Sequence, residues 1–295
     1  MKPAAFAYAR PDSIDDALRQ LAAGDGRSKV IAGGQSLGPM LNMRLAVPAE
    51  LIDLNDFTEL AYIRDVGDSI EIGALTRHHQ LAESALVQAQ CPLLGQAART
   101  IGHYAIRQRG TLGGSLAHAD PAAQLPLVAV TLQARIELIS VRGRRILPAT
   151  EFFLSAMTTA IAPDEIIRSV RFPKAAIAEG SSFKLFNRRH GDFAIVAVAA
   201  SLALEGQRIA RLSLGVGGLD AVPRNVDALV QPVLAQVPQA GWTEAAARAV
   251  LATLVPVDDA RIPAQYRQEL TQTLVQQALT RALERAIAKR DGGSS

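Results

Sequence analysis

The chain has 295 residues, of which 49% are hydrophobic and 20% charged, and its formal net charge is only +3. This composition supports a sizeable core, in one large or two medium domains. The small charge, without a block of Lys and Arg, argues against nucleic acid as a partner. No run approaches the roughly 20 apolar residues of a membrane span, and the start lacks a secretory signal pattern. We therefore expect a cytoplasmic protein without a membrane span.

The cysteine and histidine content limits the metal chemistry that this chain can carry. One cysteine, Cys91, excludes a disulfide within the chain. It also excludes a self-contained iron–sulfur cluster, which usually needs four thiolates. The histidines form no H-E-x-x-H motif and have no C-x-x-C nearby. These histidines are His78, His79, His103, His118 and His190. We expect all five to be loop or partly exposed side chains without a catalytic role, and we predict no metal site.

The first part of the chain alternates strand and helix patterns. A helix is predicted from Ser13, a good N-cap with Asp16 three residues later, to Gly24, a natural end. Short strands are predicted at 29–32 and 51–54 from their apolar residues. Further predicted elements are strands at 62–64 and 69–72, two helices separated at Pro92 within 75–102, a helix at 125–132, and strands at 135–139, 144–147 and 165–172.

The second part of the chain changes character after a linker predicted at 175–180. Three antiparallel strands are predicted, at 182–189, 194–204 and 208–216. A helix capped by Thr243 is predicted to reach residue 254. The last predicted helix, 263–289, has an apolar stripe at helical spacing and should be buried on one side. The pattern therefore predicts an α+β protein with two domains, residues 1–175 and 176–295.

Two glycine-rich stretches are the candidate ligand-binding loops. Val30–Arg44 reads V-I-A-G-G-Q-S-L-G-P-M-L-N-M-R, and Arg109–Pro126 reads R-G-T-L-G-G-S-L-A-H-A-D-P-A-A-Q-L-P. Glycine lets backbone N–H groups approach a ligand closely, and successive N–H groups form anion-binding concavities. Neither stretch has the P-loop or the G-x-G-x-x-G pattern. The two stretches predict a phosphate-bearing cofactor held from two sides, and the alternative is that the glycines only shape tight turns.

Both stretches resemble the FAD loops of the medium, flavin-binding subunit of molybdenum hydroxylases, a family that includes carbon monoxide and xanthine dehydrogenases. The matching motifs are A-G-G-Q-S-L at 32–37 and T-L-G-G-S-L-A-H-A-D-P at 111–121. A third stretch, F-K-L-F-N-R-R-H-G-D-F-A-I-V at 183–196, resembles the opening of that family's C-terminal domain. The resemblance covers nearly the whole chain. It implies a vanillyl-alcohol-oxidase (PCMH)-type FAD-binding domain in two halves, then a domain of three antiparallel strands with a helical bundle.

The resemblance also implies which residues surround a non-covalently bound FAD. They are Ala32, Gly33, Gly34, Gln35, Ser36, Leu37, Ile101, Gly110, Thr111, Gly113, Gly114, Ser115, Asp120, Gln124, Ile167, Lys184 and Phe193. Phe193 is expected against the flavin ring, with core packing as the alternative. Lys184 is expected to reach the cofactor unless it is a surface lysine, and Asp120 is either a ligand contact or a turn residue. Two residues depart from the family: Ser115 replaces an Asn, and Gln124 replaces an acidic residue without its charge.

The resemblance implies an oxidoreductase subunit that passes electrons from iron–sulfur clusters through FAD to an external acceptor. It needs no acid–base pair, because the cofactor carries the hard chemistry. The implied partners are a small iron–sulfur subunit and a large molybdopterin subunit, in a dimer of heterotrimers that docks around 184–193. Two alternatives remain: a stand-alone FAD-dependent oxidase or reductase of the same flavin fold, and a non-catalytic nucleotide-binding module.

Overall fold

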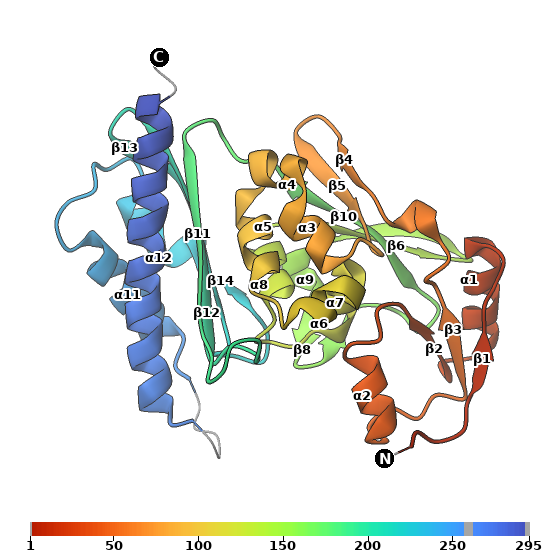
Figure 1. Cartoon of the computed structure of the whole chain (residues 1–295). Coiled ribbons are helices and arrows are strands. Elements are labelled where there is room, and N and C mark those ends of the chain that lie inside the picture. The colour runs from red at the N-terminus through yellow and green to blue at the C-terminus, as the bar shows by residue number, and fades with distance from the viewer. Residues whose placement is uncertain (1, 257–261, 293–295) are drawn as a thin grey trace.

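The computed structural model describes residues 2–256 and 262–292. The chain forms three parts in order: an N-terminal lobe, a five-stranded sheet with several short helices, and a four-stranded sheet with a long helix. In Figure 1 the lobe lies at the right, the short helices lie between the two larger sheets, and the long helix α12 stands upright on the left side. Strands and helices are mixed throughout, as the α+β prediction requires.

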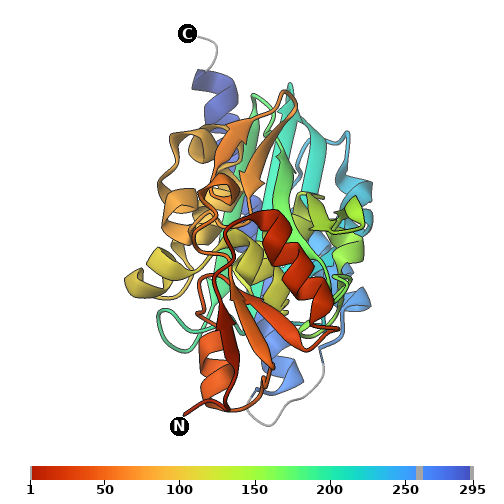
Figure 2. The same cartoon turned by 90° about the vertical axis from the view of Figure 1, so that its right-hand side faces the viewer.

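The N-terminal lobe is a small parallel sheet with one covering helix, and Figure 2 views it from the front. Its elements are β1 (Ala7–Ala9), α1 (Ile14–Ala23), β2 (Ser28–Ile31), α2 (Leu37–Asn42) and β3 (Glu50–Asp53). The strand order is β1-β3-β2, with both pairs parallel. Ser13 caps α1 as predicted, because its hydroxyl accepts a hydrogen bond from the Asp16 N–H at 3.1 Å. Strand β1 and helix α2 had no clear signal in the sequence.

The central sheet has the order β4-β5-β10-β6-β7, and each strand pairs with its neighbours in antiparallel fashion. Its strands are β4 (Ile63–Asp65), β5 (Ser69–Gly73), β6 (Arg135–Ser140), β7 (Gly143–Pro148) and β10 (Ile166–Pro173). The predicted hairpins β4–β5 and β6–β7 are both present, and the predicted strand β10 lies between them. This sheet is the scaffold on which the short helices pack.

The short helices lie before, within and after the second glycine stretch. They are α3 (His78–Glu83), α4 (Ala85–Gln90), α5 (Pro92–Arg99), α6 (Tyr104–Arg109), α7 (Leu112–His118), α8 (Gln124–Thr131) and α9 (Ala149–Phe152), with a 3-10 turn at Thr58–Leu60. Pro92 is the first residue of α5, as its missing N–H favours. The glycine stretch, interpreted from sequence as a loop, is largely helical: Gly113 and Gly114 lie in the first turn of α7.

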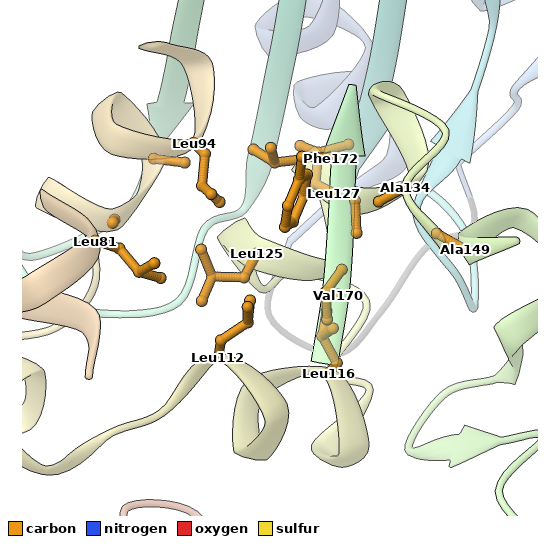
Figure 3. Close-up of a cluster of buried hydrophobic side chains, with 14 of the residues drawn as sticks. Leu81, Leu94, Leu112, Leu116, Leu125, Leu127, Ala134, Ala149, Val170 and Phe172 are labelled. Atoms are coloured by element: carbon orange, nitrogen blue, oxygen red, sulfur yellow. The ribbon is translucent and has the colours of Figure 1, made fainter. Parts of the chain in front are cut away.

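The largest hydrophobic cluster joins the central sheet to the short helices (Figure 3). Leu112 and Leu116 of α7 and Leu125 of α8 are fully buried beside Val170 and Phe172 of β10. Helix α8 is buried on all sides because it lies between this core and the C-terminal sheet. Each fully buried leucine or phenylalanine contributes about 1.5–3 kcal/mol relative to exposure. The core therefore fixes α7, and the second glycine stretch with it.

The C-terminal part is an antiparallel sheet of order β11-β12-β13-β14 covered by helices. Its elements are β11 (Glu179–Phe186), β12 (Val196–Glu205), β13 (Arg208–Gly217), β14 (Arg224–Asn225), α10 (Asp227–Val230), a 3-10 turn at Gln231–Val233, α11 (Trp242–Thr253) and α12 (Ala264–Gly292). The three predicted strands are present, and β14 is a short fourth. Two details of the prediction are wrong. Strand β11 begins inside the predicted linker, and Gly241 rather than Thr243 is the N-cap of α11.

Helix α12 packs closely against β11, and helix α5 is hydrogen-bonded to both of them. A Cβ on Gly180 would lie 2.0 Å from the Ala282 carbonyl oxygen, so the strand and helix backbones nearly touch. The Gln96 carboxamide oxygen accepts from the Phe183 N–H at 3.2 Å and from Arg285 at 2.8 Å. Gln96 therefore joins α5, β11 and α12. Within residues 2–256 and 262–292, no helix is long and apolar enough to cross a membrane.

Candidate cofactor site

A cavity of about 980 Å³ lies where the two glycine stretches meet. Its volume is near the upper end of the roughly 300–1,000 Å³ common for ligand and cofactor sites. The predicted cofactor residues that line it are Ala32, Gly33, Gly34, Gln35, Ser36, Leu37, Ile101, Gly110, Thr111, Gly113, Gly114, Ser115, Gln124, Ile167 and Phe193. Residues separated by as much as 161 positions in the chain, from Ala32 to Phe193, are thus brought around one space, which is large enough for a dinucleotide-sized cofactor.

The first glycine stretch presents unused backbone donors to this cavity. Gly34 has φ +69°, a left-handed conformation that glycine adopts without strain. From Gly34 to Leu37, no backbone N–H has a hydrogen-bond acceptor in the part of the chain that the structure describes. The Gln35 side chain folds back instead and donates to the Gly33 carbonyl at 2.8 Å. A run of unpaired N–H groups fits an anionic group such as a pyrophosphate.

The second glycine stretch differs, because its N–H groups are already used. The Leu112 N–H donates to the Thr76 carbonyl at 3.0 Å, and the Gly113 N–H to the Ala74 carbonyl at 2.8 Å. The Gly114 N–H donates to the Thr111 hydroxyl, which caps α7. This stretch therefore does not repeat the backbone cradle of the first, although the sequence predicted two equivalent cradles. Its glycines permit close packing: a Cβ on Gly113 would lie 2.7 Å from the Ala74 Cβ.

The two stretches also touch each other directly. A Cβ on Gly33 would lie 2.2 Å from the Arg109 carbonyl oxygen and 2.9 Å from the Gly110 Cα. Gly33 is itself buried. Only glycine fits at this crossing, because the opposing atoms belong to the backbone and cannot rotate away. The crossing brings the free N–H groups of the first stretch close to the start of α7.

His78 was missed by sequence reasoning and belongs to the wall of this cavity. It is 6% exposed, so the expectation of a loop or partly exposed histidine is wrong for this residue. Its Nε2 donates to the Thr111 carbonyl at 3.0 Å, which places the proton on Nε2 because a carbonyl only accepts. Nδ1 has no partner among the described residues. Burial lowers the pKa of His78 from 6.5 to about 4, so the ring is neutral at pH 7.

The other residues at the cavity supply mostly neutral contacts. Phe193 lines it from the C-terminal part and is 54% exposed, so the side chain is not buried core. Gln124, at the start of α8, is buried and donates to the Thr100 carbonyl at 3.4 Å. Burial also lowers the pKa of His118, which lines the cavity from the end of α7. No group of three His, Cys, Asp or Glu side chains that could hold a metal occurs among the described residues.

Two predicted site residues lie elsewhere. Asp120 accepts a hydrogen bond from the Ala122 N–H at 2.8 Å, which is the turn role that the sequence left open. Lys184 lies in β11 between Phe183 and Leu185, which pack on the central core. Because neighbouring side chains of a strand point to opposite faces, Lys184 points away from that core. Neither residue lines the cavity.

Sequence reasoning also missed one wall of the cavity, a small hairpin. Strands β8 (Phe153–Ser155) and β9 (Thr158–Thr159) pair, and Met157 between them has φ +59°. Met157, Thr158 and Thr159 line the cavity, as do Ile161 to Pro163. Such short strands leave no periodic signal in a sequence. Only the folded chain shows that this segment closes the site.

The same fold is found in known proteins. Residues 4–175 match the model of the FAD binding domain in molybdopterin dehydrogenase, and residues 181–282 match the CO dehydrogenase flavoprotein C-terminal domain. The chain is 41% identical to the 6-hydroxypseudooxynicotine dehydrogenase complex subunit alpha of Paenarthrobacter nicotinovorans, over 97% of each chain.

Two solved structures superpose on the chain almost completely. A chain of carbon monoxide dehydrogenase from Hydrogenophaga pseudoflava matches with a TM-score of 0.93 and 33% identity, over 97% of this chain and 99% of that one. A chain of quinoline 2-oxidoreductase from Pseudomonas putida 86 matches with a TM-score of 0.92 and 31% identity, over 97% and 99%. With the cavity, the free N–H groups and these matches together, the chain belongs to the FAD-binding medium-subunit family of the molybdenum hydroxylases.

Proposed function

We propose that this chain holds one non-covalent FAD in the cavity between its glycine stretches and uses it to pass electrons from iron–sulfur clusters to an external acceptor. The observation that carries the proposal is the run of unpaired N–H groups from Gly34 to Leu37 in that cavity. An anionic pyrophosphate satisfies such groups without a charged side chain beside it. The proposed FAD contacts are the predicted residues that line the cavity, without Asp120 and Lys184.

FAD supplies the redox chemistry when it is bound, and the residues of this chain supply binding and orientation. The hydroxyls of Ser36 and Ser115 lie in the cavity wall and can donate to phosphate oxygens. Phe193 offers an aromatic face at the exposed side of the site. His78 is a poor proton acceptor near pH 7, because its pKa of about 4 makes the neutral ring a weak base. The side chains therefore give a site for electron transfer rather than for proton abstraction.

The electrons must come from another subunit. The one cysteine of this sequence cannot ligate an iron–sulfur cluster, and Cys91 is buried, which raises the pKa of its thiol to about 12. We propose a small iron–sulfur subunit and a large molybdopterin subunit as partners, in a dimer of heterotrimers. Relatives are named as medium subunits or complex subunits, which supports a heteromeric enzyme. The proposed docking face is the rim around Phe193, where the cavity opens.

A cytoplasmic location is also part of the proposal. The only cysteine of the sequence, Cys91, is a buried free thiol, which suits a reducing compartment. The location can be checked by cell fractionation of a tagged chain. Recovery of the tagged chain in the soluble cytoplasmic fraction is the expected result, and recovery outside the cytoplasm would contradict it.

Purification alone and with partners tests the central proposal. Alone, the chain should elute from gel filtration with stoichiometric FAD and should not hydroxylate any organic substrate. Co-expressed with an iron–sulfur subunit and a molybdopterin subunit of this enzyme family, the chain should co-purify in a complex that hydroxylates. Hydroxylation by the isolated, metal-free chain would instead indicate a stand-alone flavin enzyme. Purified chain without a flavin spectrum, even after incubation with FAD, would contradict the cofactor assignment.

A further inference from the structure

Two side chains behind the cavity join the two glycine stretches by hydrogen bonds. Asn55 follows β3, and its Nδ2 donates to the Ala32 carbonyl at 2.8 Å. Its Oδ1 accepts from Nη2 of Arg77 at 2.8 Å. Nη1 of the same guanidinium donates to the Arg109 carbonyl. A chain of three hydrogen bonds therefore runs from the residue before Gly33 to the residue before Gly110.

The second stretch is held at three consecutive carbonyls by the start of α3. The Arg109 carbonyl accepts from Arg77, and the Gly110 carbonyl accepts from the His78 N–H at 3.0 Å. The Thr111 carbonyl accepts from His78 Nε2 at 3.0 Å. The backbone of residues 109–111 consequently moves with α3. The Gly33 contact and the Asn55–Arg77 hydrogen bond are two direct links between this backbone and the first stretch.

The Arg77 guanidinium is placed by neutral groups. No salt bridge of Arg77 occurs in the described part of the chain. Burial lowers its pKa, and so does the nearby charge of Arg109, while the Asp53 carboxylate acts in the opposite direction. A planar fork with several N–H donors can reach an amide oxygen and a carbonyl oxygen at once, which a lysine ammonium on a flexible stem cannot do equally well. The geometry of the fork is thus the property that this position uses.

We propose that Arg77 and Asn55 are positioning residues that fix the spacing of the two glycine stretches and thereby set the affinity for FAD. Neither side chain lines the cavity, so neither touches the cofactor. The inference rests on the proposed FAD site. The free N–H groups of residues 34–37 belong to the first stretch, and Ser115 belongs to the second, and both line the cavity. A cofactor gripped from both sides loses contacts on one side when the spacing relaxes.

We call the hydrogen bonds that run through Asn55 and Arg77 the bridge. Titration of the full-length apo chain with FAD tests its role. Arg77→Met and Asn55→Ala should each weaken FAD binding about 10- to 100-fold, since each breaks hydrogen bonds of a charged donor or of its partner. The double variant should be no weaker than the worse single variant, because the residues act as one unit. Arg77→Lys should not restore wild-type affinity. Arg171→Met, which breaks an exposed pair with Glu71 on the central sheet, is the matched control and should leave FAD affinity unchanged.

Asn55→Asp separates bridge geometry from simple charge pairing. It places a carboxylate beside Arg77, but it removes the donor to the Ala32 carbonyl and to Asp53 Oδ1, and it sets the new carboxylate oxygens against both of these acceptors. The bridge requires weaker FAD binding in this variant, whereas charge pairing alone would leave or strengthen it. Thermal melting of the apo variants gives the second readout, and their melting temperatures should match that of Arg171→Met.

Three results would overturn the inference. The first is an FAD affinity within about twofold of wild type for both single variants. The second is wild-type FAD affinity in Arg77→Lys. The third is a loss of FAD affinity that is fully explained by unfolding of the apo variant. The proposed electron transfer fails by a different result. A wild-type chain that binds FAD but yields no hydroxylating complex with its partners would end that proposal and leave the bridge intact.

Discussion

The two glycine stretches look alike in sequence and do different work in the fold. In Ala32–Leu37 the backbone donors from Gly34 onward are free and line the cavity. In Thr111–Ser115 the donors are bonded to Ala74, Thr76 and Thr111, and the glycines let α7 pack closely. A Gly-Gly pair followed by a small hydroxyl residue is therefore not by itself a phosphate cradle. The acceptors available nearby decide whether the N–H groups remain for a ligand.

The largest expected effect comes from adding one methyl group to each stretch. In Gly33→Ala the new Cβ meets the Arg109 carbonyl oxygen at 2.2 Å, a backbone atom that cannot rotate away. In Gly114→Ala it meets only the Thr111 hydroxyl, at 2.8 Å. Gly33→Ala should weaken FAD binding about 100-fold or more, which is near the upper end of overpacking effects, and Gly114→Ala less than about tenfold. Equilibrium titration followed by flavin fluorescence measures both, and equal losses would contradict the distinction.

Acid should remove the stability that His78 contributes through its contact with the second stretch, and in the described part of the chain the first stretch has no such histidine contact. Folded His78 titrates at about 4, and the unfolded residue near 6.5, so the unfolded state binds the proton more tightly. The contribution of this residue to stability is therefore fully present above about pH 6.5 and is lost as the pH falls toward 4. Its limit is about 3 kcal/mol. Denaturant melts at pH 7 and pH 5 should show a larger loss for wild type than for His78→Gln, whose amide can still donate to the Thr111 carbonyl.

The neighbouring histidine provides the control for that pH dependence. His79 is partly exposed, and its Nδ1 lies 3.3 Å from the Arg107 carbonyl. His79→Gln should keep the wild-type loss of stability between pH 7 and pH 5. If His78→Gln and His79→Gln both match wild type, the buried imidazole does not govern acid sensitivity, and other groups must be responsible.

Replacing one hydroxyl in each stretch should separate ligand binding from folding. Thr111→Val removes the cap that accepts from the Gly114 N–H, and it should lower stability by about 0.5–2 kcal/mol. The Ser36 hydroxyl makes no capping hydrogen bond, so Ser36→Ala should change apo stability by less than about 0.5 kcal/mol. Ser36→Ala should still weaken FAD binding by about tenfold. Denaturant melts of the apo chains and FAD titrations give the two values, and a stability loss in Ser36→Ala equal to that of Thr111→Val would oppose the assignment.

The sequence predicted the regular parts of the fold, because their signals are local. The Ser13 cap, the break at Pro92, both central hairpins and the stripe of α12 depend on residues within a few positions of each other. The strand β1, the helix α2 and the β8–β9 hairpin are too short to leave a period. Their places depend on packing against distant parts of the chain.

The sequence predicted where the cofactor site lies, but it did not predict which backbone groups are free there, for physical reasons. The two glycine motifs predicted their own residues at the cavity, whereas His78, the β8–β9 hairpin and the partners of the N–H groups did not follow from any motif. Those partners, such as the Ala74 carbonyl, lie some 40 positions away in the chain. The orientation of Lys184 could have been predicted from the sequence. Phe183 and Leu185 on either side are apolar and pack on the core, so the lysine between them faces away from that core. Arg77 and Asn55 have no motif, and only the folded backbone reveals their role.

The smallest expected effect on binding lies at the rim, where neither glycine stretch acts. Phe193 is 54% exposed and lines the cavity from the C-terminal part of the chain. Truncating an exposed side chain costs little, so Phe193→Ala should change stability by less than about 0.5 kcal/mol. FAD affinity should change less than about threefold, because the grip on the pyrophosphate lies elsewhere.

An aromatic ring against the flavin quenches its fluorescence and limits access, so the variant should show brighter bound FAD and altered rates with external acceptors. Phe186→Ala, which removes a ring contact with Tyr266 outside the cavity, is the control and should leave both readouts unchanged. Unchanged fluorescence and acceptor kinetics in Phe193→Ala would show that the rim residue does not meet the flavin, and the docking face proposed around it would lose its main support.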